Sequence, residues 1–224
     1  MKDKKKYCII YDMDGILIDT EPQYLKIGIS LLKDEGVEIT GQDFEKYVGT
    51  SSIQMWDELI SVYNLNLKPE YFIEKSRKLV NDLLELNHSF PPLVPGILEF
   101  LNKFTQIPSG VASSTSLPLI KRCLEKAGII DHFSSFTSGH EVKKSKPAPD
   151  VFLLASERLG YSPDRCFVIE DSRNGTLAAK EAGMHCIGLQ NSNSGNQDLS
   201  LANKVVHNYQ EAYEYLSLQL TIDN

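Results

Sequence analysis

The sequence has few cysteines, no long apolar segment and no excess of basic residues. Its four cysteines lie far apart and form no Cys-x-x-Cys pair, and three of them sit in apolar, strand-like runs, which indicates buried free thiols in a reducing compartment. No run of about 18 apolar residues occurs, so we expect no membrane-spanning helix. The net charge of −7 argues against a nucleic-acid partner, because nucleic-acid-binding proteins normally present a basic face.

A recognisable secretory signal is also missing. The chain opens with the basic segment Met1–Lys6, but the apolar residues behind it are too few for a signal peptide and are interrupted at Asp12. Together with the absences above, this predicts a cytoplasmic protein that binds neither membranes nor nucleic acid. The chain of 224 residues, 42% of them hydrophobic, is long enough to bury a core without disulfides or a structural metal. Its oligomeric state stays open between a monomer and a small homo-oligomer.

Short apolar runs alternate with segments of helical periodicity from residue 89 to the end of the chain. This alternation predicts an α/β fold with a Rossmann-like parallel sheet that is covered by helices on both faces. The predicted strands are Cys8–Tyr11, Gly110–Ser113, Phe133–Thr137, Cys166–Ile169, His185–Leu189 and Val205–Val206. The predicted helices are Ile97–Phe104, Leu117–Ala127, Asp150–Leu159 and Thr176–Ala182.

A block of helical periodicity interrupts this pattern between the first and second strands. Residues 22–88 show apolar spacing typical of helices and contain no convincing strand, and the block is too long for an ordinary connection. We therefore expect a helical cap domain, residues 20–88, inserted into a core domain formed by residues 1–19 and 89–224. Thr20 with Gln23 three residues later matches a capping box, which favours a helix start at this boundary.

Polar side chains follow four of the predicted strands. In an open parallel sheet, ligands bind beyond the carboxyl ends of the strands, so these side chains are expected to meet in one cleft. They are Asp12 and Asp14, Ser113 and Ser114, Lys146, and Glu170 and Asp171.

This combination suits the chemistry of a phosphate ester. Clustered carboxylates repel one another and need a compensating cation, and a few oxygen ligands favour Mg²⁺ with a substrate phosphate. A lysine and serine hydroxyls then suit phosphoryl oxygens. Asp12 could attack phosphorus to give an aspartyl-phosphate, while Asp14 could protonate the leaving oxygen and later activate water.

The same residues resemble the four motifs of the haloacid dehalogenase superfamily. All four occur in the family's order, and the insert lies where the β-phosphoglucomutase-like subfamily carries its α-helical cap. The motifs are Asp12–Gly15 with Asp19–Pro22 behind it, Val111–Ser114, Ser145–Asp150 and Val168–Ser172. The resemblance implies a hydrolase of small phosphorylated metabolites with a cap that closes over the substrate and excludes bulk water.

The resemblance also implies roles for the carboxylates. Asp12 is expected to be the nucleophile and a Mg²⁺ ligand. Asp14 is expected to be the acid and base, with its backbone carbonyl also on the metal. Asp171 would complete the protein ligands of the ion. Glu170 is expected either to bind the ion as well or to hold one of its water molecules.

The remaining motif residues are expected to bind phosphate. By resemblance, Ser113 and the backbone N–H of Ser114 hold the transferring phosphoryl group, and Lys146 neutralises that group and orients Asp12. In the cap, Tyr24 and Thr50 are the candidates for substrate contact.

Two positions depart from the mutase pattern. Where β-phosphoglucomutases have a histidine tied to turnover this chain has Tyr24, and where they have a phosphate-binding arginine it has Ser52. We therefore expect a phosphatase, with a sugar phosphate as the favoured substrate class. A sugar-phosphate mutase is the alternative. A non-catalytic binding protein is disfavoured, because every carboxylate and Lys146 are present.

Three further features have structural interpretations. Asp19 is expected to hold the turn behind the first motif, and Ser116 to cap the helix that follows the second strand. The polar segment Gln190–Ser200 is expected to be a loop that is mobile or faces an opening.

Overall fold

The computed structural model describes residues 6–45, 47, 52–85 and 90–222. The chain forms two compact units. The sheet unit comprises Met1–Asp19 and Pro92–Asn224, and the helical unit comprises Thr20–Pro91.

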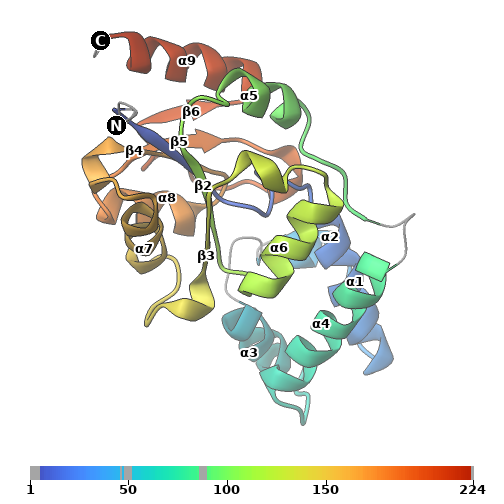
Figure 1. Ribbon diagram of the computed structural model, residues 1–224. Helices are drawn as coiled ribbons and strands as arrows, with labels where there is room; N and C mark the ends of the chain where they lie inside the picture. Colours follow the sequence, from blue (N-terminus) through green and yellow to red (C-terminus); the bar gives the residue numbers. More distant parts are fainter. Residues whose placement is uncertain (1–5, 46, 48–51, 86–89, 223–224) are drawn as a thin grey trace. The chain divides into compact units, whose positions relative to one another are not determined.

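A parallel sheet forms the centre of the sheet unit (Figure 1). Among the described residues it has six strands in the order β3-β2-β1-β4-β5-β6. The strands are β1 (Cys8–Tyr11), β2 (Ser109–Ser113), β3 (Ser135–Ser138), β4 (Cys166–Glu170), β5 (His185–Leu189) and β6 (Lys204–Val206). Because β1 lies between β2 and β4, the residues that follow these three strands emerge side by side at one edge. The predicted Rossmann-like α/β fold is confirmed.

Helices cover both faces of this sheet (Figure 1). Helices α7 and α8 pack on one face, and α5 and α9 on the other, while α6 packs beside β3. Their bounds are α5 (Ile97–Lys103), α6 (Leu117–Lys126), α7 (Asp150–Leu159), α8 (Arg173–Glu181) and α9 (Tyr209–Ile222).

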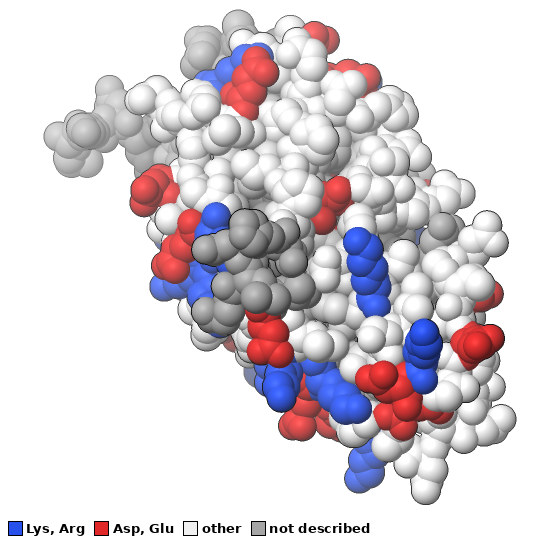
Figure 2. Space-filling view, turned by 90° about the vertical axis from the view of Figure 1, so that its right-hand side faces the viewer, with Lys and Arg blue, Asp and Glu red and all other residues white. Residues whose placement is uncertain are grey.

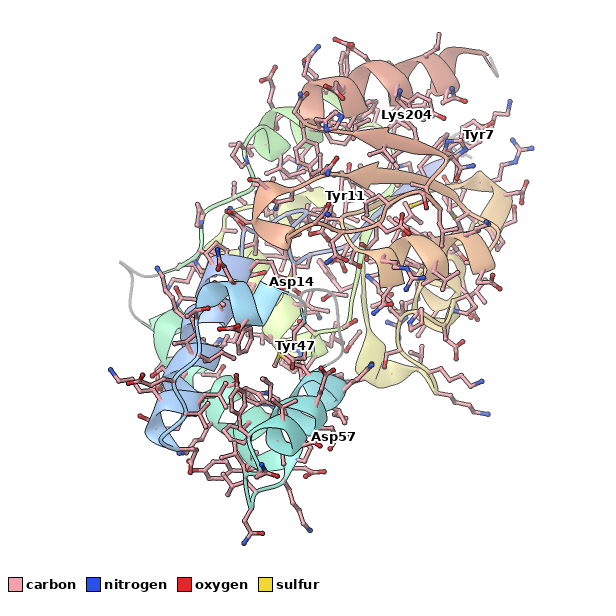
Figure 3. The ribbon with its side chains drawn as sticks, turned by 180° about the vertical axis from the view of Figure 1, so that it is seen from behind. Tyr7, Tyr11, Asp14, Tyr47, Asp57 and Lys204 are labelled. Atoms are coloured by element: carbon pink, nitrogen blue, oxygen red, sulfur yellow. The ribbon has the colours of Figure 1, made fainter. Side chains whose placement is uncertain are left out.

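The burial of β1 explains why its sequence is an uninterrupted apolar run. All four of its residues are buried, since helices cover both faces of the strand. Cys8 and Ile10 join the core beneath α7 and α8. Tyr11 lies within the sheet unit (Figure 3) and makes edge-to-face ring contacts with Phe100 and Phe133.

The structure differs from the prediction by more than one residue at the starts of two elements, and it contains one helix that was not predicted. The third strand begins at Ser135, because Ile130–His132 forms a short 3₁₀ helix and Phe133 packs against Tyr11 instead of opening the strand. Helix α8 begins at Arg173 and not at Thr176, because the Ser172 hydroxyl accepts a capping hydrogen bond from the backbone N–H of Gly175. The C-terminal helix α9 was not predicted.

The helical unit has its own apolar core. Its helices are α1 (Glu21–Asp34), α2 (Gly41–Glu45), α3 (Ser52–Val62) and α4 (Pro69–Glu85). The ring of Trp56 stacks on that of Phe72 with centroids 4.2 Å apart, and Phe44 packs against Gly28, where a Cβ atom would lie 2.3 Å from the Phe44 ring. The predicted capping box is wrong in detail: Thr20 occupies the N-cap position of α1, but its side chain accepts no capping hydrogen bond.

The surface carries charges of both signs. On the face drawn in Figure 2, basic and acidic side chains are interspersed, and no large basic patch is visible among the described residues. None of the helices that the structure describes has the length and apolar character needed to cross a membrane.

Candidate active site

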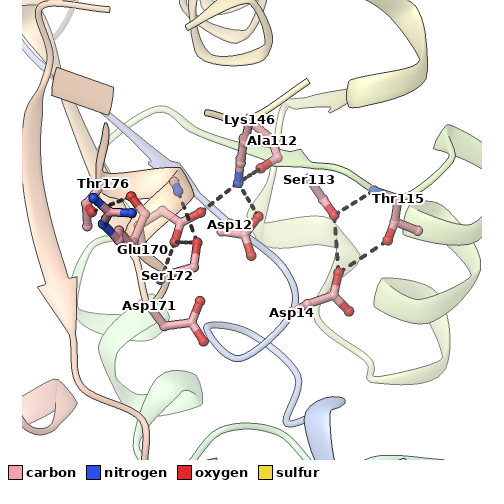
Figure 4. A network of polar contacts seen from close by, with 12 residues as sticks. Asp12, Asp14, Ala112, Ser113, Thr115, Lys146, Glu170, Asp171, Ser172 and Thr176 are labelled. Carbon is pink, nitrogen blue, oxygen red and sulfur yellow. Dashed lines mark hydrogen bonds and ion pairs between the residues drawn. The ribbon is translucent and has the colours of Figure 1, made fainter. Parts of the chain in front are cut away.

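The polar residues that follow β1, β2 and β4 meet at the carboxyl-terminal edge of the sheet (Figure 4). Asp12 lies at the centre of this group. Glu170 and Asp171 flank it on the β4 side, and Asp14 with Ser113 on the β2 side. The chain path explains this placement, since Asp12 and Asp171 directly follow the neighbouring parallel strands β1 and β4, in which Tyr11 pairs with Ile169.

Lys146 links two of the carboxylates. Its Nζ atom lies 2.5 Å from Oδ1 of Asp12 and 2.8 Å from Oε1 of Glu170, and it also donates to the carbonyl oxygen of Ala112 at 3.3 Å. The Lys146 side chain is only 6% exposed. Burial lowers the pKa of Lys146, but the charges of Asp12 and Glu170 outweigh that effect, so the pKa lies above its ordinary value and the ammonium group stays charged.

Asp12 is held in an environment that disfavours its charge. The residue is 7% exposed, and burial raises the pKa of its carboxyl group to about 7, with Lys146 opposing the rise and Glu170 and Asp14 adding to it. Lys146 therefore does not fully compensate the negative charge. A further cation near Asp12 would favour the ionised carboxylate at neutral pH.

Glu170 is fixed by contacts to both of its oxygens. Oε1 accepts from Lys146, while Oε2 accepts from the backbone N–H of Ser172 at 2.7 Å and from its hydroxyl at 3.0 Å. Gly175, in the first turn of α8, leaves room for this carboxylate, since a Cβ atom there would lie 1.7 Å from Oε1.

Asp14 is held by hydroxyl groups from the loop after β2. Its Oδ2 atom accepts from Oγ of Ser113 at 3.3 Å and from Oγ1 of Thr115 at 3.2 Å. Ser138 supports the same loop, because its hydroxyl donates to the carbonyl oxygen of Thr115 at 2.7 Å. Thr115 was not predicted, although it lies within a run of hydroxyl residues, Ser113–Ser116, whose position after a strand was the available signal.

The donor set fits a Mg²⁺ ion. Among the described residues, no three His, Cys, Asp or Glu side chains come close enough together to hold a metal ion by themselves. Mg²⁺ does not need such a group, because it binds through one or two carboxylates and completes its shell with water and phosphate oxygens. The buried carboxylates of Asp12 and Asp171, 7% and 5% exposed, are suited to this task.

Four other predicted residues do not belong to this network as the structure describes it. Ser114 is exposed on the loop after β2, and the backbone of Gly139 packs against it. Ser116 occupies the N-cap position of α6, but its side chain accepts no capping hydrogen bond, contrary to the prediction. Tyr24 belongs to the helical unit and is partly buried. Thr50 lies outside the described residues.

Comparison with known proteins places the chain among hydrolases. The family model of haloacid dehalogenase-like hydrolases matches residues 9–189. A phosphorylated carbohydrates phosphatase of Thermotoga maritima is 31% identical over 183 residues, which cover 80% of this chain and 82% of that protein. A fructose-1-phosphate phosphatase of Escherichia coli is 28% identical, covering 81% of this chain and 95% of its own.

A solved structure has the same fold. The β-phosphoglucomutase of Clostridium difficile superposes with a TM-score of 0.78 and is 25% identical, and the match covers 96% of this chain and 97% of that one.

Proposed function

The chain belongs to the haloacid dehalogenase-like hydrolases, and we propose that it is a Mg²⁺-dependent phosphatase that acts on a small phosphorylated metabolite, with a sugar phosphate as the favoured substrate class. The observation that carries this proposal is the buried contact of Lys146 with Asp12, beside an Asp14 that two hydroxyl groups hold. These side chains supply a nucleophile, a positive charge for phosphoryl oxygens and a proton-transfer group within one network.

Asp12 is the proposed nucleophile. A carboxylate oxygen of Asp12 forms a bond to phosphorus while the bond from phosphorus to the leaving oxygen breaks, which gives an aspartyl-phosphate. Lys146 keeps Asp12 in place through its Oδ1 atom and offers positive charge to the phosphoryl group. Ser113 and the backbone N–H of Ser114 are the proposed donors to the other phosphoryl oxygens.

Asp14 is the proposed acid and base. It gives a proton to the leaving oxygen in the first step. In the second step it takes a proton from the water molecule that attacks phosphorus, and the bond to Asp12 breaks to release inorganic phosphate. The hydrogen bond from Thr115 holds the carboxyl group of Asp14 in one orientation for both transfers, and the single proton of the Ser113 hydroxyl, which reaches Asp14 in this structure, turns to the phosphoryl group when substrate binds.

The proposed ligands of Mg²⁺ are Asp12, Asp171 and the backbone carbonyl of Asp14. When bound, the ion supplies positive charge that offsets the carboxylates and stabilises the charge on the reacting phosphoryl group. Both oxygens of Glu170 already accept hydrogen bonds from Lys146 and Ser172. We therefore give Glu170 the role of holding Lys146 in preference to direct coordination of the ion.

The names of the relatives support the substrate class. The relatives described above are named as phosphatases of phosphorylated carbohydrates and of fructose 1-phosphate. Tyr24 and Thr50 remain the proposed contacts to the organic part of the substrate.

The test of this proposal is hydrolysis of a generic aryl phosphate. The protein with Mg²⁺ should release phosphate, EDTA should stop the release, and the Asp12→Asn variant should lose at least about 1,000-fold in kcat. Asp131→Asn is the matched control, because this exposed aspartate lies in the 3₁₀ helix before β3, and it should keep wild-type activity. Full activity of Asp12→Asn would refute the assignment of Asp12 as the nucleophile.

Once hydrolysis is established, a panel of phosphorylated metabolites would identify the preferred substrate.

A sugar-phosphate mutase is the second candidate, because the solved β-phosphoglucomutase has the same fold over nearly the whole chain. Hydrolysis is favoured because Tyr24 and Ser52 replace the histidine and arginine of the mutase pattern. The two reactions can be distinguished by incubating the protein with β-glucose 1-phosphate and a trace of the corresponding glucose bisphosphate. Glucose 6-phosphate that forms faster than inorganic phosphate would favour the mutase.

A further inference from the structure

A short turn after β5 contacts both carboxylate-bearing loops of the site. The 191–194 turn, which comprises Asn191 and the 3₁₀ helix Ser192–Ser194, begins with an asparagine whose side chain has two defined partners. Its Oδ1 atom accepts from the backbone N–H of Asn193 at 2.9 Å, and its Nδ2 atom donates to the carbonyl oxygen of Gly15 at 2.9 Å. These partners fix the orientation of the amide, since a reversed amide would place like groups against each other.

The other end of the turn reaches Asp171. Ser194 is 1% exposed, and its hydroxyl donates to Oδ2 of Asp171. A buried hydroxyl that donates to a buried carboxylate restricts rotation of that carboxylate.

The first motif packs against these two residues without spare room. Gly15 has a positive φ of 76°, and a Cβ atom there would lie 1.9 Å from Oδ2 of Asp171 and 2.8 Å from Oγ of Ser194. The backbone N–H of Gly15 donates to the carbonyl oxygen of Ile18 at 2.8 Å, which closes the loop that carries Asp14. Asn193 adds a hydrogen bond of 2.6 Å to Asp19 at the end of that loop.

We propose that Asn191 and Ser194 are positioning residues, through which the 191–194 turn holds the Asp12–Asp19 loop and Asp171 at the separation that a shared Mg²⁺ ion requires. The inference rests on the proposed function, which makes Asp12 and Asp171 ligands of one ion. The two carboxylates follow different strands, and the turn contacts the loop after β1 and Asp171 through side-chain hydrogen bonds. The polar segment after β5, expected to be mobile or to face an opening, is thus in contact with the site.

The first variant removes the contact to Asp171. Ser194→Ala deletes the hydroxyl, and we expect the Kd for Mg²⁺, measured by isothermal titration calorimetry without substrate, to rise about 10- to 100-fold. Ser192→Ala is the matched control, because Ser192 lies in the same 3₁₀ helix but is exposed. The control should bind Mg²⁺ as the wild type does. A Kd for Ser194→Ala within about twofold of the wild type would overturn the role of Ser194.

The second variant separates positioning from simple support of the turn. Asn191→Asp keeps the oxygen that accepts from the N–H of Asn193, but it places a second oxygen against the carbonyl of Gly15. We expect the turn to survive, with a nearly unchanged thermal midpoint, while kcat for the aryl phosphate falls and KM changes little. The fall should be on the order of 10-fold or more. An unchanged kcat would overturn the role of Asn191.

The same measurements separate this inference from the proposed function. If the wild type binds Mg²⁺ and hydrolyses the aryl phosphate while Ser194→Ala and Asn191→Asp match it, the inference alone fails. If the wild type binds no Mg²⁺, the proposed metal site fails and the inference fails with it.

Discussion

At the scale of single residues, two glycines shape the site by the space that they leave. Gly15 allows Asp171 to approach the first motif, and Gly175 allows Glu170 to lie against the first turn of α8. In both cases the missing Cβ atom would fall less than 2 Å from a carboxylate oxygen, at 1.9 Å and 1.7 Å. These carboxylates therefore owe their positions to neighbouring backbone as well as to hydrogen bonds.

Gly175→Ala should lower activity even though it raises helix propensity. Alanine is favoured over glycine by about 1 kcal/mol in a helix, but its Cβ atom would displace Glu170 and with it Lys146. We expect kcat for the aryl phosphate to fall on the order of 100-fold, because a small misplacement of catalytic groups has such effects. Gly41→Ala is the control, since a Cβ atom there meets Leu25 at an ordinary 3.6 Å. Equal activity of both variants would contradict this account of Gly175.

The charged residues at the strand ends were easier to single out from the sequence than the neutral residues that contact them. Asp12, Lys146 and Asp171 could be recognised because charged side chains at strand ends need a compensating partner. Thr115, Asn191 and Ser194 could not, because hydroxyl and amide residues after a strand are equally typical of turns and helix caps. Their partners Asp14, Gly15 and Asp171 are distant in sequence, and only the fold brings them into contact.

At the scale of elements, the strands were predicted within one or two residues, while α9 was missed. Strands β1 and β4 are short runs of mainly apolar residues bounded by polar ones, a pattern that is consistent with buried strands. Helix α9 does bury Tyr209, Ala212 and Leu216 at helical spacing, but the residues between them are mixed and the segment follows a strand of three residues. Only the structure shows that this helix covers part of the sheet, where it packs on α5, β5 and β6.

The contact between β5 and α9 should weaken in mild acid. The His185 ring stacks on Tyr215, and its Nε2 atom lies 2.9 Å from the Tyr215 hydroxyl. Burial lowers the pKa of His185 below its ordinary value of 6.5. The unfolded state therefore binds more protons just below pH 6.5, so this contribution to stability is present above that pH and declines as the pH falls through the folded-state pKa.

Urea unfolding at pH 7 and at mildly acidic pH measures this effect. Between these two conditions, the urea concentration at the unfolding midpoint should fall further for the wild type than for His185→Gln, because glutamine does not titrate in this range. His140→Gln is the control, because His140 is exposed, and it should behave as the wild type does. Equal acid sensitivity of the wild type and His185→Gln would contradict the role of His185.

At the scale of the whole molecule, the two segments of the sheet unit that lead into and out of the helical unit are hydrogen-bonded to each other. The chain leaves the sheet unit after Asp19 and returns at Pro92, and the backbone N–H of Asp19 donates to the carbonyl oxygen of Pro92 at 2.9 Å. Ile18 and Leu93 form an antiparallel bridge beside it. Helical periodicity led to the prediction of an insert, but the segment before Val94 contains two prolines and no regular period, so its end has no sharp signal in the sequence.

Separate cores should allow the two units to unfold separately. The single tryptophan, Trp56, lies in the core of the helical unit and reports on that unit, whereas the proposed ligands of Mg²⁺ all lie in the sheet unit. When the free ion concentration is about 100 times the Kd, an ion that binds only the folded sheet unit stabilises that unit by about 2.7 kcal/mol. Mg²⁺ should therefore shift the urea transition followed by circular dichroism, while the transition of Trp56 fluorescence stays where it was.

The Asp171→Asn variant provides the control for this experiment, because loss of a proposed ligand should remove the Mg²⁺-dependent shift and leave the Trp56 transition unchanged. Equal shifts in both signals would contradict separate unfolding and would show that the two cores unfold as one cooperative unit. No shift in either signal would instead contradict the binding of Mg²⁺ by the sheet unit. The two signals therefore distinguish an error about the metal site from an error about the independence of the units.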